Sequence, residues 1–216
     1  MGSLIGISLW VALVTVVPGL ITIACLYGGA QIVNTECLRE HLHRVQTDSD
    51  WVWAGFGVTA MVLTQYLGIL LERFLISKKM LGPEEQKIDI PEGIDPHGET
   101  SILLHPYAEY NGLYILLAEL CEDEDTQGHL KRVIAQFFLT NNTLISFGLG
   151  IVFTSIAFIS CLSWSVFWPY VFYTLTLTVF LWVSYKTAAI RFSIMAKSLW
   201  ATRRRHIKIG SKCEES

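Results

Sequence analysis

The longest uncharged stretch of the chain decides its fold class. Residues 133–185 read VIAQFFLTNNTLISFGLGIVFTSIAFISCLSWSVFWPYVFYTLTLTVFLWVSY, without a single Asp, Glu, Lys or Arg. As one α-helix this stretch would extend about 80 Å, whereas the hydrocarbon core of a bilayer is about 30 Å thick. It therefore predicts two transmembrane spans, at about 141–162 and 166–185, joined by a short turn.

Two further uncharged stretches lie in the first third of the chain. Residues 1–35 carry no charged side chain, and neither do residues 51–71. Each can hold a helix of about 20 residues, the length that crosses a bilayer, so we expect spans at about 4–33 and 51–76. Pro18 predicts a kink in the first span, because proline lacks the N–H that a helix needs.

The predicted fold class is an all-α integral membrane protein with four transmembrane helices and a helical cytoplasmic segment between spans 2 and 3. Composition agrees: hydrophobic residues make up 52% of the chain and charged residues only 16%, against about 25% charged residues in soluble domains. The net charge of −3 gives no sign of a nucleic-acid partner. The five cysteines are dispersed, without the spacing of a disulfide framework or a metal site, and no metal or cofactor is expected.

We expect the chain to divide into two membrane hairpins, a segment between them and a tail. The predicted parts are residues 1–77, 78–140, 141–187 and 188–216. Within the middle segment, Pro91 and Pro96 mark an irregular loop, and apolar residues at helical spacing predict a helix from Ser101 to about Cys121. The tail alternates basic and apolar residues, a pattern typical of an amphipathic helix that lies along lipid headgroups.

Lysine and arginine residues predict the orientation. All but Arg39 and Arg44, that is 14 of the 16, fall on the side that holds the middle segment and the tail. Because loops rich in Lys and Arg stay in the cytoplasm, we expect a multi-pass protein of the cell (inner, cytoplasmic) membrane with both termini cytoplasmic.

Polar residues within or at the edge of the spans are the first candidate site. Polar groups inside a membrane usually face other helices or a cavity. We favour hydrogen bonds between helices, and the lining of a pore is the alternative. The candidates are Gln65, Asn141, Asn142, Thr143 and Ser146.

Small residues four apart are a second feature of the spans. They let helices approach closely, either within one chain or between copies. The pairs are Ala24 with Gly28, Gly55 with Thr59, and Ser146 with Gly150.

Two groups outside the spans could contact partners. A row of tyrosines at helical spacing could bind a soluble protein: Tyr107, Tyr110 and Tyr114. Basic residues of the tail could bind anionic lipid headgroups: Arg203, Arg204, Arg205 and Lys208.

No catalytic motif is recognisable, which leaves three hypotheses about function. The first is a non-enzymatic membrane protein that self-assembles into a homo-oligomer, as a pore, a channel or a membrane effector. The second is a membrane anchor or adaptor that docks a soluble cytoplasmic partner. The third is a small membrane-embedded enzyme that acts on a lipid-like substrate.

Overall fold

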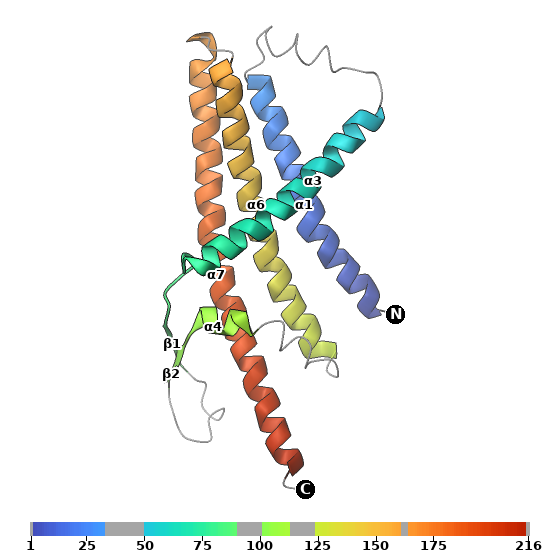
Figure 1. Ribbon diagram of the computed structural model, residues 1–216, viewed down its shortest axis with the longest axis vertical. Helices are drawn as coiled ribbons and strands as arrows, with labels where there is room; N and C mark the ends of the chain where they lie inside the picture. The colour runs from blue at the N-terminus through green and yellow to red at the C-terminus, as the bar shows by residue number, and fades with distance from the viewer. Residues whose placement is uncertain (1, 33–49, 90–100, 113–123, 161–163, 215–216) are drawn as a thin grey trace. The chain divides into compact units, whose positions relative to one another are not determined.

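Long helices account for most of the chain. A computed structural model describes residues 2–32, 50–89, 101–112, 124–160 and 164–214 (Figure 1). The four long helices are α1 (Gly2–Ile32), α3 (Asp50–Ser77), α6 (Glu124–Ser160) and α7 (Phe167–Glu214). The short elements are β1 (Gln86–Asp89), β2 (Ser101–Leu104), α4 (Pro106–Asn111) and the 3-10 turn η1 (Trp164–Val166).

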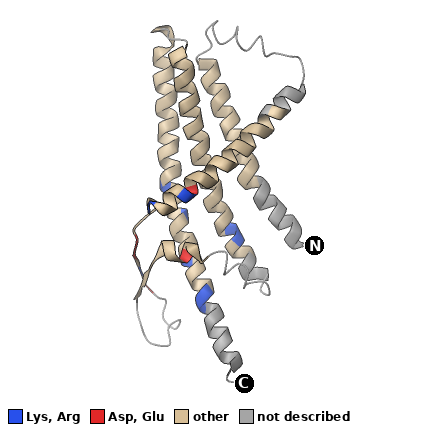
Figure 2. Cartoon of the chain, viewed as in Figure 1, with Lys and Arg blue, Asp and Glu red and all other residues tan. Residues whose placement is uncertain are grey.

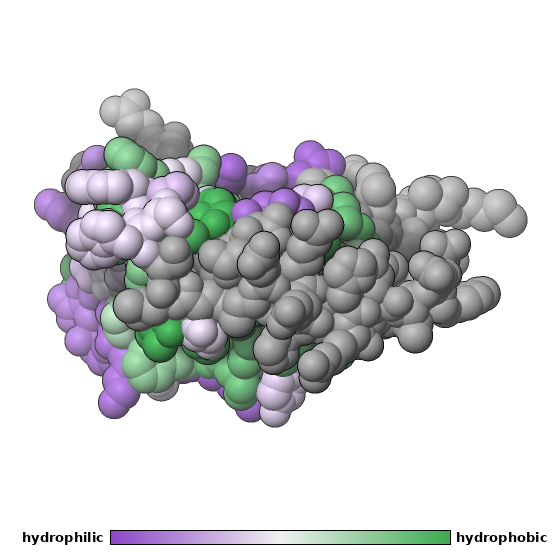
Figure 3. Space-filling model, turned by 90° about the horizontal axis from the view of Figure 1, so that it is seen from above, coloured by the Kyte–Doolittle hydropathy of each residue, from purple (hydrophilic) through white to green (hydrophobic). Residues whose placement is uncertain are grey.

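Four helices are long and apolar enough to cross a membrane. The candidate spans are Leu13–Ile32, Gly57–Ser77, Gly128–Ser160 and Trp164–Arg204. Large apolar side chains lie exposed on them, among them Val62, Ile156 and Phe172, and hydrophobic residues reach the surface in Figure 3. The chain is therefore a multi-pass membrane protein with four apolar helices, as predicted.

The chain forms two compact units. Unit 1 comprises residues 1–3, 73–137 and 188–216, and unit 2 comprises residues 4–72 and 138–187. Among the described side chains, the acidic and basic residues of unit 2 are Glu72 and Lys186 alone, each at or next to a boundary of the unit. In Figure 2 the helices of unit 2 are accordingly almost free of blue and red.

Within unit 2, α6 contacts each of the other three helices. On the α7 side, Phe147 stacks on Phe180 with ring centroids 5.4 Å apart, and Phe158 stacks on Tyr170 at 4.2 Å. On the α1 side, Gly150 packs against Cys25. Figure 1 shows α3 running across both α1 and α6, and hydrogen bonds described below join all three. The middle of this bundle is thus built around α6.

Unit 1 contains a small sheet that the sequence did not predict. Strands β1 and β2 pair antiparallel, with Gln86 opposite Leu104 and Asp89 opposite Ser101. The prediction of a helix that begins at Ser101 is therefore wrong, and the mostly helical chain contains this one pair of short strands among its described residues. Helix α4 begins at Pro106, because proline suits the first helical turn but disfavours helical geometry in the residue before it. The predicted continuation beyond residue 112 lies outside the described residues.

The core of unit 1 gathers around Phe192 of α7. Its buried ring lies 5.0 Å from the ring of Tyr107, 5.8 Å from that of Phe137 and 6.1 Å from that of Tyr110, centroid to centroid. Other buried residues of the same helix are Ala188, Met195, Ala196 and Leu199. Part of the apolar face of the tail is thus covered by protein in unit 1, whereas Ile190 and Ile194 of the same helix are exposed.

Tyr107 also ties helix α4 to the turn that follows α3. Its hydroxyl accepts a hydrogen bond from the Leu81 N–H at 3.0 Å and donates one to the Gly82 carbonyl at 3.0 Å. Leu81 is almost completely buried, so its amide has no access to water as a substitute acceptor. A buried donor without an acceptor costs about 1–3 kcal/mol.

We expect Tyr107→Phe to lower the free energy of unfolding by about 1–3 kcal/mol, because the Leu81 amide then loses its acceptor. Hydrogen exchange of the purified protein in mild detergent should show faster exchange at Leu81. Tyr27→Phe removes the same atom from an exposed ring of α1 and serves as the control. Unchanged protection of Leu81 in Tyr107→Phe would contradict this role.

Candidate functional site

A proline in α1 creates the polar site of unit 2. Pro18 lies inside α1 and has no N–H, so the carbonyl one turn earlier, that of Val14, loses its helical donor. Asn142 of α6 supplies the replacement: its Nδ2 lies 3.2 Å from the Val14 oxygen. The same nitrogen donates to Oε1 of Gln65 on α3 at 2.7 Å. One side chain of α6 therefore joins three helices.

The next turn of α6 contacts the proline itself. The Ser146 hydroxyl lies 2.8 Å from the Pro18 carbonyl and 3.1 Å from the Asn142 carbonyl of its own helix. The Thr22 hydroxyl of α1 also donates to the Pro18 carbonyl, at 3.0 Å. The Pro18 carbonyl thus accepts hydrogen bonds from hydroxyl groups of both α1 and α6.

A pair of threonines extends this network from α1 to α3. Oγ1 of Thr22 lies 2.9 Å from Oγ1 of Thr64, and Thr64 donates to the Ala60 carbonyl at 2.7 Å. Each hydroxyl has one proton and also a backbone acceptor in its own helix, Pro18 for Thr22 and Ala60 for Thr64, so either threonine can be the donor when the two hydroxyls bond to each other. Both threonines are buried, and such bonds hold helices together in a membrane.

Asn141 and Thr143 make different uses of their polar groups. Asn141 is fully buried and its Nδ2 donates to the Gly68 carbonyl of α3 at 2.8 Å. Its Oδ1 has no hydrogen-bond partner among the described residues. Thr143 donates to Leu139 of its own helix at 2.8 Å. The structure thus brings Gln65, Asn142 and Ser146 together and places Asn141 beside them against α3, while Thr143 bonds only within α6.

Glycines allow the helices to approach closely enough for these bonds. A Cβ added to Gly68 would overlap Oδ1 of Asn142, and one added to Gly150 would lie 2.7 Å from Cβ of Cys25. A Cβ on Gly28 would lie 2.7 Å from the hydroxyl of Tyr173, which donates to the Cys25 carbonyl at 2.7 Å. Gly55 differs, because nothing lies within 4 Å of a Cβ added there.

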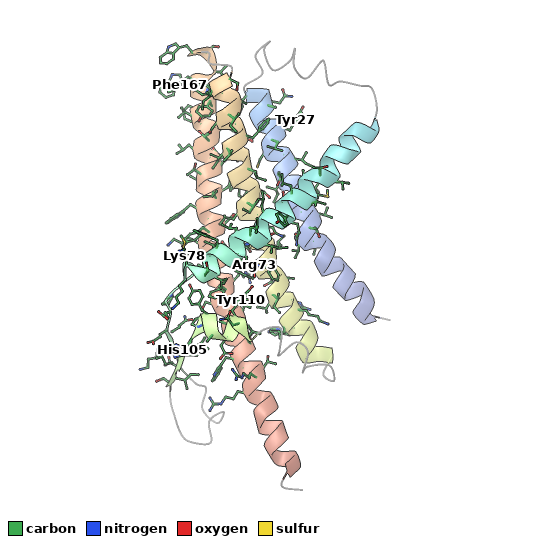
Figure 4. All side chains as sticks on the ribbon, viewed as in Figure 1. Tyr27, Arg73, Lys78, His105, Tyr110 and Phe167 are labelled. Atoms are coloured by element: carbon green, nitrogen blue, oxygen red, sulfur yellow. The ribbon has the colours of Figure 1, made fainter. Side chains whose placement is uncertain are left out.

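The tyrosine candidates of unit 1 are partly committed to its core. Tyr107 is buried and Tyr110 is half-buried against Phe192. Figure 4 shows Tyr110 on α4, with His105 at the start of that helix. Tyr114 lies outside the described residues.

The basic candidates lie near the end of α7. Arg203 places Nη1 3.9 Å from Oε1 of Glu109, whose pKa is raised by burial of the carboxyl, with the Arg203 charge opposing that shift. Arg204 lies over the ring of Trp200, 5.2 Å from its centroid, in a cation–π contact. The side chains of Arg205 and Lys208 lie outside the described residues.

Sequence reasoning missed Thr22, Thr64 and Tyr173 as members of the network. Thr22 could have been found, since Ser and Thr hydroxyls in helices often donate to the carbonyl oxygen four residues earlier, which here is that of Pro18. Thr64 and Tyr173 could not, because their partners Thr22 and Cys25 lie more than 40 residues away in sequence. The sequence pattern carries no information on which turns of two helices face each other.

No protein-family model, no curated protein and no solved structure matches this chain.

Among the described residues no group of three or more His, Cys, Asp or Glu side chains could hold a metal ion. The network itself consists of amides and hydroxyls that do not titrate near neutral pH. Its chemistry is therefore suited to joining helices.

We expect the cost of Asn142→Leu to depend on Pro18. With proline present the substitution leaves the Val14 carbonyl without a donor, at a cost of about 1–3 kcal/mol. In a Pro18→Ala background the new Ala N–H supplies that donor, so the cost should fall by about 1 kcal/mol. A double-mutant cycle on thermal unfolding in detergent measures the difference.

The matched control for this cycle is Thr143→Val, which removes a hydroxyl that bonds only within α6. It should show no coupling to Pro18. An equal cost of Asn142→Leu in both backgrounds would contradict the replacement of the missing proline donor by Asn142.

A second substitution tests the close contact of α3 with α6. We expect Gly68→Ala to lower the free energy of unfolding by about 1–3 kcal/mol, because the new methyl displaces Asn142 from Val14 and Gln65. Gly148→Ala is the control, since its Cβ would meet Leu181 at an ordinary 3.7 Å. Equal midpoints of thermal unfolding for the two variants would argue against this contact.

Proposed function

We propose that this chain is a non-enzymatic, multi-span membrane protein that self-assembles, and that its copies together form a pore or another membrane effector. One observation carries the proposal. Of the three small-residue pairs, the spans use two inside the chain: Gly28 packs against Tyr173, and Gly150 against Cys25. The third pair, Gly55 and Thr59, is exposed and available to a helix of another copy.

The shape of this third pair suits contact between helices. Gly55 has no side chain, and the Thr59 hydroxyl donates to the Gly55 carbonyl at 2.8 Å. The polar group of Thr59 is thus satisfied within α3, and what the pair offers a neighbour is a shallow, uncharged surface. Such surfaces let two backbones approach, and the gain in van der Waals contact drives association where no hydrophobic effect operates.

The internal network bears on where a conducting path would run. Asn142 donates to Val14 of α1 and to Gln65 of α3, and Ser146 donates to Pro18 of α1. Opening a path through one bundle would break these bonds at a cost for each buried group. The proposed pore therefore runs between copies.

We further propose that unit 1 is cytoplasmic, together with both termini, in the cell membrane. Its support is the distribution of Lys and Arg along the chain under the positive-inside rule. The apolar helices of unit 2 then lie in the lipid bilayer. Membrane lipids are therefore the first partner we assign to this protein.

The anchor or adaptor hypothesis has one observation in its favour. Unit 1 has its own core around Phe192 and still exposes large apolar side chains, Met80 and Leu103. Exposed apolar groups on a folded unit can dock a partner. This function becomes the leading one if the protein proves monomeric.

The first test is the native mass of the full-length protein in mild detergent. We expect a discrete homo-oligomer, and a dissociation constant at least about tenfold higher for Thr59→Leu, equivalent to about 1.4 kcal/mol. Thr176→Leu is the matched control, since Thr176 is also exposed and also donates to its own helix at 2.8 Å. It should leave the mass unchanged.

Ion flux from liposomes that contain the same sample completes this test. For a pore between copies, leakage should fall together with the oligomer in Thr59→Leu and persist in Thr176→Leu. An oligomer that seals liposomes would favour another effector role, and a wild-type monomer would overturn the proposal.

A further inference from the structure

We propose that a second copy of this chain binds along one face of α3 and that the Tyr66 hydroxyls of the two copies hydrogen-bond to each other. The proposal rests on the self-assembly proposed above and names its surface and its polar contact. It follows from the position of Tyr66, from the residues around it and from the absence of hydrogen-bond donors and acceptors in lipid acyl chains.

Tyr66 lies in the middle of the candidate span Gly57–Ser77, with 61% of its surface exposed. Its hydroxyl has no hydrogen-bond partner within the part of the chain that the structure describes. Acyl chains at that depth offer neither donors nor acceptors, so an unpaired hydroxyl there is costly. A polar group from another membrane-embedded chain would satisfy this hydroxyl.

Other tyrosines of unit 2 do not share this problem. Tyr170 shares a hydrogen bond with Ser155 at 3.1 Å, and Tyr173 donates to the Cys25 carbonyl at 2.7 Å. Tyr27 is exposed, but it lies five residues from the end of its candidate span at Ile32 (Figure 4). Near a membrane interface, water and headgroups supply hydrogen-bond partners. Tyr66 is set apart by its depth.

Tyr66 belongs to a continuous exposed stripe. Residues at alternating steps of four and three line one side of α3, and all of them are exposed: Gly55, Thr59, Val62, Tyr66 and Ile69. This spacing keeps one face of a helix turned toward a second helix over several turns. None of the five is charged, so the partner that fits the stripe is a membrane-embedded helix.

A second copy fits this stripe on chemical grounds. In a two-fold dimer with its axis along the membrane normal, the two α3 helices run parallel and equal residues face each other. A phenol is both donor and acceptor, so two Tyr66 hydroxyls can satisfy one another. Gly55, three turns away, allows the backbones to approach at the other end of the contact.

The contact can be mapped by photo-crosslinking in the full-length protein in liposomes. Benzoylphenylalanine incorporated at Val62 should yield a covalent dimer. At Leu175, an equally exposed apolar residue of α7, it should yield mainly lipid adducts. Lipid adducts alone at Val62, or crosslinks to another protein, would overturn the proposed interface.

The role of the hydroxyl needs its own variant. Tyr66→Phe should raise the dimer dissociation constant by about three- to tenfold, as loss of one hydrogen bond between membrane helices does, while Tyr27→Phe should not change it. An unchanged constant in Tyr66→Phe would overturn the hydroxyl contact even if Val62 crosslinks.

These outcomes separate the interface from the proposed function. A protein that is oligomeric by mass but crosslinks only through Leu175 retains self-assembly and overturns the α3 surface. A protein that is monomeric by mass and gives no protein crosslink at either position overturns both proposals.

Discussion

The hydrogen bond from Asn142 to the Val14 carbonyl is the contact on which the membrane bundle depends. A proline inside a transmembrane helix deprives one carbonyl of its donor, and the bilayer core has no water to replace it. Asn142 replaces it from α6 and reaches Gln65 of α3 with the same amide. The positions of three helices are thereby fixed at one point. The proline in α1 and the asparagine in α6 each explain why the other can be tolerated.

Close approach is the second condition of the bundle, and it follows from the first. A hydrogen bond between helices requires backbones near enough for short side chains to span the gap, so glycines occur where α6 meets its neighbours. Gly68 lies against Asn142, and Gly150 lies against Cys25. The apolar side chains that remain face outward, because in a membrane they gain nothing from being buried among helices rather than in lipid. Both the small interior and the large apolar surface of unit 2 therefore follow from the hydrocarbon that surrounds it.

The sequence predicted the features that depend on composition and missed those that depend on register. The lengths of the uncharged stretches predicted four apolar helices, and Pro18, Asn141, Asn142 and Ser146 were recognisable as polar positions within apolar surroundings. Their partners were not, since a carbonyl such as that of Val14 has no sequence signature. The β1–β2 pair was missed because four-residue strands leave too short a period to read, and Leu103 and Leu104 fit a helix equally well. The apolar residues of the tail suited a membrane surface or a protein core, and the sequence could not tell that Phe192 is buried in unit 1 while Ile190 and Ile194 are exposed.

Oδ1 of Asn141 and the hydroxyl of Tyr66 both lack a partner among the described residues, and the two residues differ in exposure. Asn141 is fully buried with its Oδ1 unpaired, so nothing larger than a water molecule could reach that atom without moving the helices. It bears on the interior of the bundle and not on any partner. Tyr66 is exposed and can be reached by another chain. Since every hydroxyl of the Pro18 network is bonded at comparable depth, an exposed unpaired hydroxyl is the exception in this membrane region. The balance of hydrogen bonds that explains how the four helices hold together thus also indicates where a second copy would complete it.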